Sequence, residues 1–100
     1  MMIETKFEHM LDQLEDELEG AEEYIKCAVS YKEDMPEFYE NYLRMASMEL
    51  EHANHLHNMI EKLLDRHDHH SDLAAVWEWQ NERFMRWHNK IRTKMEMARK

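Results

Sequence analysis

The sequence contains very few of the residues that break or cross-link a protein chain. Its 100 residues include one glycine, one proline and one cysteine. So few breakers leave room for only a few turns, and the lone Cys27 offers no internal disulfide. No stretch approaches the roughly 18 apolar residues of a membrane span, and the N-terminus lacks a basic-then-apolar signal. These absences predict one almost entirely α-helical domain that lies in the cytoplasm and does not enter a membrane.

Negative charge dominates the chain, but it is spread unevenly. The formal net charge is -9 at pH 7, which argues against non-specific binding to nucleic acid, because phosphates attract basic surfaces. Residues 1–71 carry 18 acidic and 6 basic side chains, whereas residues 72–100 carry 7 basic and 4 acidic ones. We therefore expect one structural unit with an acidic segment over 1–71 and a basic segment over 72–100.

Apolar side chains recur at helical spacing in three stretches, which predicts helices over residues 5–32, 35–66 and 71–99. The segment "KEDMPEF" supplies the turn after the first helix. There Asp34 is expected to cap the second helix, with Glu37 reciprocating as in a capping box. Each helix would be about 40 Å long. Because such rods cannot form a compact globule from so short a chain, we expect the monomer to be incomplete and to pair with itself.

Two carboxylates and one imidazole fall where the first two helices should be apolar. On the second helix the stripe comprises Tyr42, Met45, Glu49, His52, Leu56, Met59 and Leu63. On the first helix it comprises Leu14, Glu17, Ala21, Tyr24, Ala28 and Tyr31. The turn near residues 33 and 34 makes the helices antiparallel, and Glu17 is about as far from it as Glu49 and His52 are. The three side chains should therefore meet at one level.

This combination of side chains predicts a metal site. Carboxylates buried without a partner are strongly disfavoured and normally bind a proton or a cation. Carboxylate oxygens with an imidazole nitrogen suit a divalent transition metal better than Mg²⁺ or Ca²⁺, which prefer oxygen ligands alone. One hairpin supplies three ligands. Two hairpins around a two-fold axis would form a four-helix bundle with four glutamates and two histidines, the ligand set of a ferritin-like di-iron site.

The motifs around these residues resemble those of the ferritin-like superfamily, especially bacterioferritins and rubrerythrins. "ELEGAEEY", residues 17–24, is similar to their first-helix signature. "MELEH", residues 48–52, is similar to their second-helix Glu-x-x-His motif. The resemblance covers about residues 5–64 and implies the ferritin-like fold, with two chains pairing into one four-helix bundle.

The resemblance also implies roles for individual residues. It makes Glu17 a terminal iron ligand, Glu49 a bridge between two irons and His52 a ligand through a ring nitrogen. Tyr24 would hydrogen-bond a ligand carboxylate. The implied activity is oxidation of Fe(II) by oxygen or peroxide, and manganese or zinc would suit the same ligands.

The third helix has no Glu-x-x-His, whereas full-length members of the superfamily repeat the signature on a second helix pair. The chain is therefore similar to half-ferritins, such as encapsulated ferritins and short ferritin-like proteins of bacteria and phages. These build the bundle from two subunits. The chain ends in "MEMARK", without a recognisable apolar tail for docking into an encapsulin shell, so such a shell is not expected as a partner.

Other interpretations of the same residues stay open. Glu22 is a rival to Glu17, because it lies on an adjacent stripe of the first helix. The chain could also be a metal-free acidic interaction protein, or could bind metal without turnover. His55 and His57 are expected to face solvent. The "HDHH" of residues 67–70 is expected to be an exposed polar loop, with an adventitious surface metal as the alternative.

The third helix is predicted to present two different faces. One mostly apolar stripe should pack on the hairpin and comprises Leu73, Trp77, Gln80, Phe84, Trp87, Ile91 and Met95. Trp79 lies about 200° from Trp77 around the helix. Since interface cores are enriched in aromatics and arginine, Trp79 with Arg83 and Arg86 predicts a contact between chains and at least a dimer. A membrane-surface helix is the competing reading, but anionic lipid would repel the acidic segment.

Overall fold

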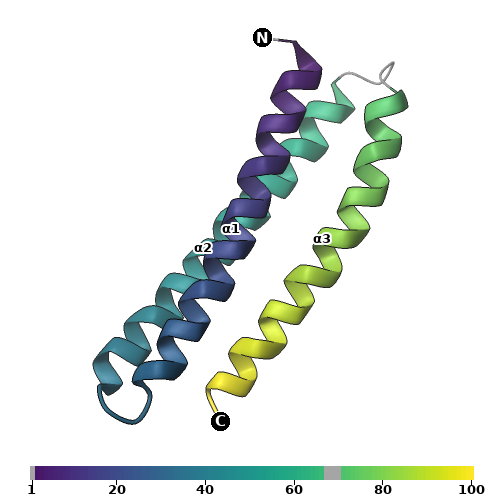
Figure 1. The fold of residues 1–100 in the computed structure, drawn as a ribbon. Coiled ribbons are helices and arrows are strands. Elements are labelled where there is room, and N and C mark those ends of the chain that lie inside the picture. The colour runs from purple at the N-terminus through teal and green to yellow at the C-terminus, as the bar shows by residue number, and fades with distance from the viewer. Residues whose placement is uncertain (1, 67–70) are drawn as a thin grey trace.

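The computed structural model consists of three long α-helices that run side by side (Figure 1). Helix α1 spans Ile3–Tyr31, α2 spans Pro36–Asp65 and α3 spans Ser71–Ala98. The structure describes residues 2–66 and 71–100, and it contains no β-strand within them. The predicted all-α class with three helices is therefore confirmed. None of these helices carries an apolar run of the length that a bilayer crossing requires.

Helices α1 and α2 form an antiparallel hairpin around apolar side chains at helical spacing. Buried alanines lie on this face of both helices, namely Ala21, Ala28, Ala46 and Ala53. Their small side chains let the two backbones approach closely. The largest side chains that are almost fully buried on the hairpin are Phe7, Leu18, Leu43 and Ile60. Burial of one such side chain contributes roughly 1.5–3 kcal/mol to folding.

Backbone hydrogen bonds, not a side-chain cap, close the turn between α1 and α2. The N-cap of α2 is Met35, which makes no side-chain cap hydrogen bond. Its N–H donates instead to the carbonyl oxygen of Tyr31 over 2.9 Å, and Pro36 begins the helix. The predicted capping by Asp34 and Glu37 is therefore wrong. Because α2 begins one residue later than that motif requires, Asp34 stands outside the N-cap position.

Helix α3 packs along α1 through the apolar stripe that its sequence predicts. Trp77, Phe84, Ile91 and Met95 are buried. The rings of Trp77 and Phe7 meet edge to face, with their centroids 6.4 Å apart. Aromatic pairs prefer such a geometry, so this contact anchors the start of α3 beside the start of α1.

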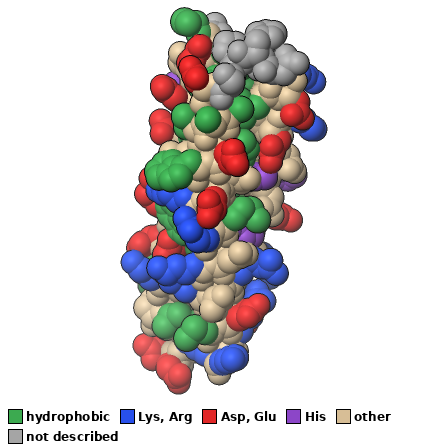
Figure 2. Space-filling model, turned by 90° about the vertical axis from the view of Figure 1, so that its right-hand side faces the viewer, with side chains coloured by type: hydrophobic (Ala, Val, Ile, Leu, Met, Phe, Trp, Pro, Cys, Tyr) green, Lys and Arg blue, Asp and Glu red, His purple; other side chains and the backbone are tan. Residues whose placement is uncertain are grey.

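Charged side chains add to the contact between α3 and the acidic hairpin. Arg83 lies 3.6 Å from a carboxylate oxygen of Glu15, and Lys94 lies 2.6 Å from one of Glu22. Figure 2 shows lysine and arginine side chains gathered in the lower half of the face that α3 presents. The basic segment therefore lies against the acidic hairpin of its own chain.

One side of the hairpin is left without a covering helix. The molecule is elongated and thin: its Cα positions extend over 54 × 23 × 14 Å. Its radius of gyration is 15.9 Å, compared with about 13 Å for a compact domain of this length. Glu15, which contacts α3, and Glu17 are two residues apart and therefore point in directions about 200° apart around α1. Glu17 thus lies on the side of the hairpin that faces away from α3.

Candidate metal centre

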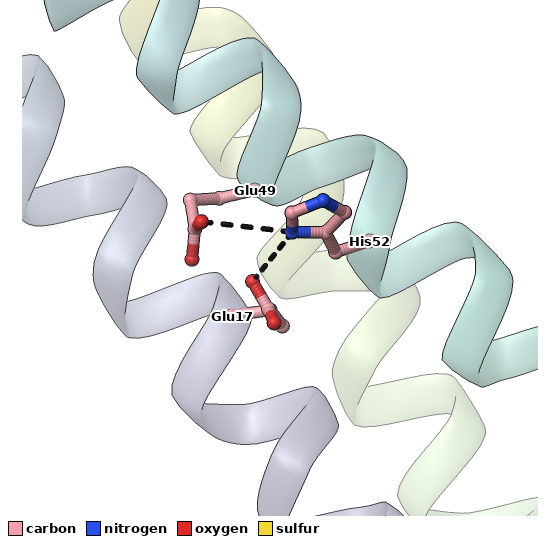
Figure 3. A group of neighbouring side chains, drawn as sticks. All are labelled: Glu17, Glu49 and His52. Atoms are coloured by element: carbon pink, nitrogen blue, oxygen red, sulfur yellow. Dashed lines mark hydrogen bonds and ion pairs between the residues drawn. The ribbon is translucent and has the colours of Figure 1, made fainter.

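Glu17 of α1 and Glu49 and His52 of α2 converge on the uncovered side of the hairpin (Figure 3). Each offers one ligand atom, and the three atoms lie within 4.8 Å of one another. His52 Nδ1 is 3.4 Å from Glu17 Oε2 and 3.7 Å from Glu49 Oε1. Two ligands of one metal at about 2.1 Å are roughly 3.0–3.4 Å apart. Small side-chain adjustments would therefore let the three atoms share one cation.

Helix geometry accounts for the convergence. Glu49 and His52 are three residues apart, so both side chains lie on one face of α2. The antiparallel turn brings Glu17 to the same height on α1, as its distance from the turn predicts. The side chains of Glu17 and Glu49 are 25% and 24% exposed, and that of His52 is 51% exposed. The group is therefore open to solvent, or to a second protein chain, on one side.

Glu17 makes ionisation of the neighbouring Glu49 carboxyl group less favourable. A side-chain hydrogen bond with Glu17, together with burial and the Glu17 charge, raises the pKa of Glu49 to about 7, although nearby His52 opposes this shift. Like charges at such separations disfavour double ionisation. A divalent cation would remove this repulsion, so the donor set fits a metal.

The surface around the group is partly apolar. A shallow cavity of about 320 Å³ adjoins it, lined by Gln13, Asp16, Glu17, His52, His55, Leu56 and Met59. Met45 and Met59 are exposed on the same stripe of α2. His55 is exposed, as the sequence predicts, and lines this cavity. The carboxylate and imidazole group therefore lies in an open surface of mostly polar residues that includes a few exposed apolar side chains.

Two side chains have surroundings that differ from those expected. Tyr24 makes no hydrogen bond to a carboxylate in the described part of the chain, and its ring packs against Tyr42 with centroids 6.1 Å apart. The implied role of Tyr24 as a partner of the ligands is therefore not seen. His57, which was expected to face solvent, is half-buried, because its Nε2 lies 2.7 Å from Asn81 Oδ1 and its ring packs on Trp77. That prediction was wrong.

Glu22, the rival to Glu17, is occupied by α3. Lys94 and Trp87 both donate hydrogen bonds to its carboxylate. Burial raises the pKa of Glu22, but these hydrogen bonds and the charges of Lys94 and Lys90 outweigh that effect, so its pKa lies below the usual value. The structure therefore selects Glu17 as the first-helix member of the group. The histidines of residues 67–70 lie outside the described residues.

Gly20 is not among the predicted site residues, yet it lies directly beside Glu49. Its importance could have been predicted from the sequence, because a single glycine inside a long helical pattern usually has a packing or functional reason.

Comparison with known proteins does not assign the chain to a family. No family model, no curated protein and no solved structure matches it. The features of this chain that bear on its function are therefore the geometry of Glu17, Glu49 and His52 and the two motifs that contain them.

Proposed function

We propose that the chain is a half-length ferritin-like protein that binds iron at Glu17, Glu49 and His52 and oxidises Fe(II). The observation that carries this proposal is the convergence of two carboxylates and one imidazole within 4.8 Å on adjacent helices. The raised pKa of Glu49 adds to it, because the negative charge of Glu49 is disfavoured beside Glu17 and a metal cation would compensate that charge.

Two copies of the chain would complete the site. One chain supplies three ligands, and its hairpin is covered by α3 on one side only. A two-fold axis through the uncovered side would bring together four glutamates and two histidines in a four-helix bundle. The same contact would cover Met45 and Met59, which one chain leaves exposed. The proposed partner is therefore a second copy, and the assembly is at least a homodimer.

The proposed reaction uses Fe(II) as substrate and oxygen or peroxide as oxidant. Two Fe(II) ions lose one electron each, and O₂ takes up these two electrons and two protons to become H₂O₂. With peroxide as oxidant, the same two electrons and two protons yield two waters. The carboxylates of Glu17 and Glu49 favour the harder Fe(III) product, and His52 completes the donor set. Manganese or zinc would suit the same ligands without this turnover.

An anaerobic Fe(II) titration tests the proposal. The wild-type protein should bind one iron per chain, and its exposure to oxygen should produce ferric absorbance faster than a protein-free control. Glu49→Ala should abolish stoichiometric binding while the helical circular dichroism persists. Glu51→Ala removes an exposed acid from the same helix and should leave binding unchanged. Equal iron affinity in Glu49→Ala and wild type would contradict the assignment.

The same contacts also favour a second candidate, a metal-free helical interaction protein. A protonated His52 lies within ion-pair distance of both Glu17 and Glu49, so the three groups can compensate one another without a metal. Metal analysis of protein purified without a histidine tag separates the candidates. Retained iron favours the first, and failure to bind any transition metal favours the second. Binding without faster oxidation would indicate a metal-binding protein that has no turnover.

A further inference from the structure

Gly20 is the only glycine of the chain, and it lies in the middle of α1. Glycine is disfavoured in a helix interior because it loses more backbone freedom on folding than any other residue. Neither usual reason for such a glycine applies here. Its φ is not positive, and α1 continues to Tyr31. The reason for Gly20 must therefore lie in what surrounds it.

The carboxylate of Glu49 occupies the space that a side chain at position 20 would need. A Cβ atom there would lie 2.8 Å from Glu49 Oε2, 3.5 Å from Cδ and 3.7 Å from Cγ. The first distance is shorter than real Cβ atoms show, whereas the other two are ordinary contacts. Gly20 and Glu17 are three residues apart and share one face of α1. The missing side chain therefore opens the place beside Glu17 in which the Glu49 carboxylate lies.

We infer that Gly20 is a positioning residue for the metal centre: it leaves room for the carboxylate of Glu49 to lie against α1, beside Glu17 and His52. The effect of Gly20 on metal binding rests on the proposed function, whereas the contact of Gly20 with Glu49 does not. An alanine at position 20 would push Oε2 from 2.8 Å to at least the 3.4 Å of ordinary contact. This displacement moves the carboxylate away from α1, which carries Glu17, and adds to the adjustment that a shared metal already requires, so it should weaken metal binding.

Gly20→Ala should weaken metal binding without lowering the stability of the protein. The clashing atom is the end of a flexible side chain, so it can move without disturbing the helices. Alanine also has a higher helix propensity than glycine. Gly20→Ala should therefore fold, with an unfolding midpoint at least as high as that of the wild type, and should bind metal less tightly. A glycine that served only the packing of α1 and α2 would give the reverse: a lower midpoint with unchanged affinity per folded chain.

The first measurement is a double-mutant cycle on metal-free protein. Gly20→Ala is introduced into the wild type and into Glu49→Ala, and unfolding midpoints are compared. The gain in midpoint should be larger in the Glu49→Ala background, where no carboxylate has to move. Equal gains in both backgrounds would overturn the inference. This cycle requires no metal, so it decides the role of Gly20 even if the proposed function fails.

The second measurement uses Co²⁺ as a spectroscopic probe of the centre. Gly20→Ala should lower Co²⁺ affinity on the order of 10- to 100-fold, as loss of a positioning contact around a metal typically does. Glu23→Ala, an exposed α1 residue outside the group, is the matched control and should match the wild type. Unchanged affinity in Gly20→Ala would overturn the inference. Absence of any transition-metal binding by the wild type would instead overturn the proposed function.

Discussion

Lys94 of α3 places its Nζ atom 2.6 Å from Oε2 of Glu22 on α1, and Trp87 donates its indole N–H to the other oxygen of the same carboxylate. One acidic side chain thus receives two donors from a helix far away in sequence. The contact attaches the basic segment to the acidic hairpin, and it leaves Glu17 as the acid that faces Glu49 and His52.

Removal of this carboxylate should loosen α3 without affecting the metal centre. Glu22→Ala would leave the Trp87 N–H and the Lys94 ammonium without their acceptor. We expect the free energy of unfolding to fall by about 1–2 kcal/mol, a modest value because both charged side chains are partly exposed. Chemical denaturation measures the change, and Glu23→Ala on the exposed face of α1 is the control. Loss of iron binding at unchanged stability would contradict the assignment and would exchange the roles of Glu22 and Glu17.

The stability of the metal-free protein should depend on pH through Glu49. The folded-state pKa of Glu49 is raised from 4.5 to about 7, so between these values the folded chain binds more protons than the unfolded chain. The contribution of Glu49 to stability is therefore fully present below about pH 4.5 and is lost as pH rises through 7. A full shift would correspond to roughly 3 kcal/mol, and partial solvent exposure should reduce it to about 1 kcal/mol.

Glu49→Gln isolates this contribution, because glutamine keeps the shape of the side chain but does not titrate. The variant should be more stable than the wild type above pH 7, and the difference should disappear as pH falls below about 5. Denaturant midpoints of both proteins at pH 4.5, 6 and 8 give the comparison. A constant difference across these values would mean that folding does not raise the pKa of Glu49.

The local part of the fold could be predicted because it depends on spacing alone. Apolar residues three and four positions apart define each helix, and a short antiparallel turn places residues equally far from it at one height. These two rules suffice to bring Glu17, Glu49 and His52 together. Whether the group binds metal is a separate question, because fold does not imply function.

Features that depend on a single position or on another helix could not be predicted in this way. The capping by Asp34 failed because a shift of one residue moves the N-cap to Met35. The environments of His57 and Glu22 depend on where α3 lies, and periodicity within one helix contains no information on that placement. The spacing that pairs Glu17 with Tyr24 was likewise no guide to whether that tyrosine would meet a carboxylate or an aromatic ring.

Trp79 should become buried between chains. Its side chain is 64% exposed and points about 200° away from Trp77, which packs on α1. Val76, one turn earlier, is also exposed, and Arg86 lies two turns later on the same face. Large exposed aromatics beside arginine are typical of interface centres, where truncation commonly costs 2 kcal/mol or more. Trp79→Ser should therefore weaken self-association by about 30-fold or more while helicity stays unchanged.

Light scattering over a range of micromolar concentrations measures this effect of Trp79→Ser. Glu78→Ser alters the exposed neighbouring residue and serves as the control, which should retain the mass of the wild type. If Trp79→Ser keeps the wild-type mass at every concentration, Trp79 lies outside any contact between chains, although pairing through Glu17, Glu49 and His52 could persist. A wild-type protein that is monomeric at every concentration would also contradict the proposed metal centre, because one chain carries three of the six ligands. In that case neither the contact at Trp79 nor the shared iron site would exist.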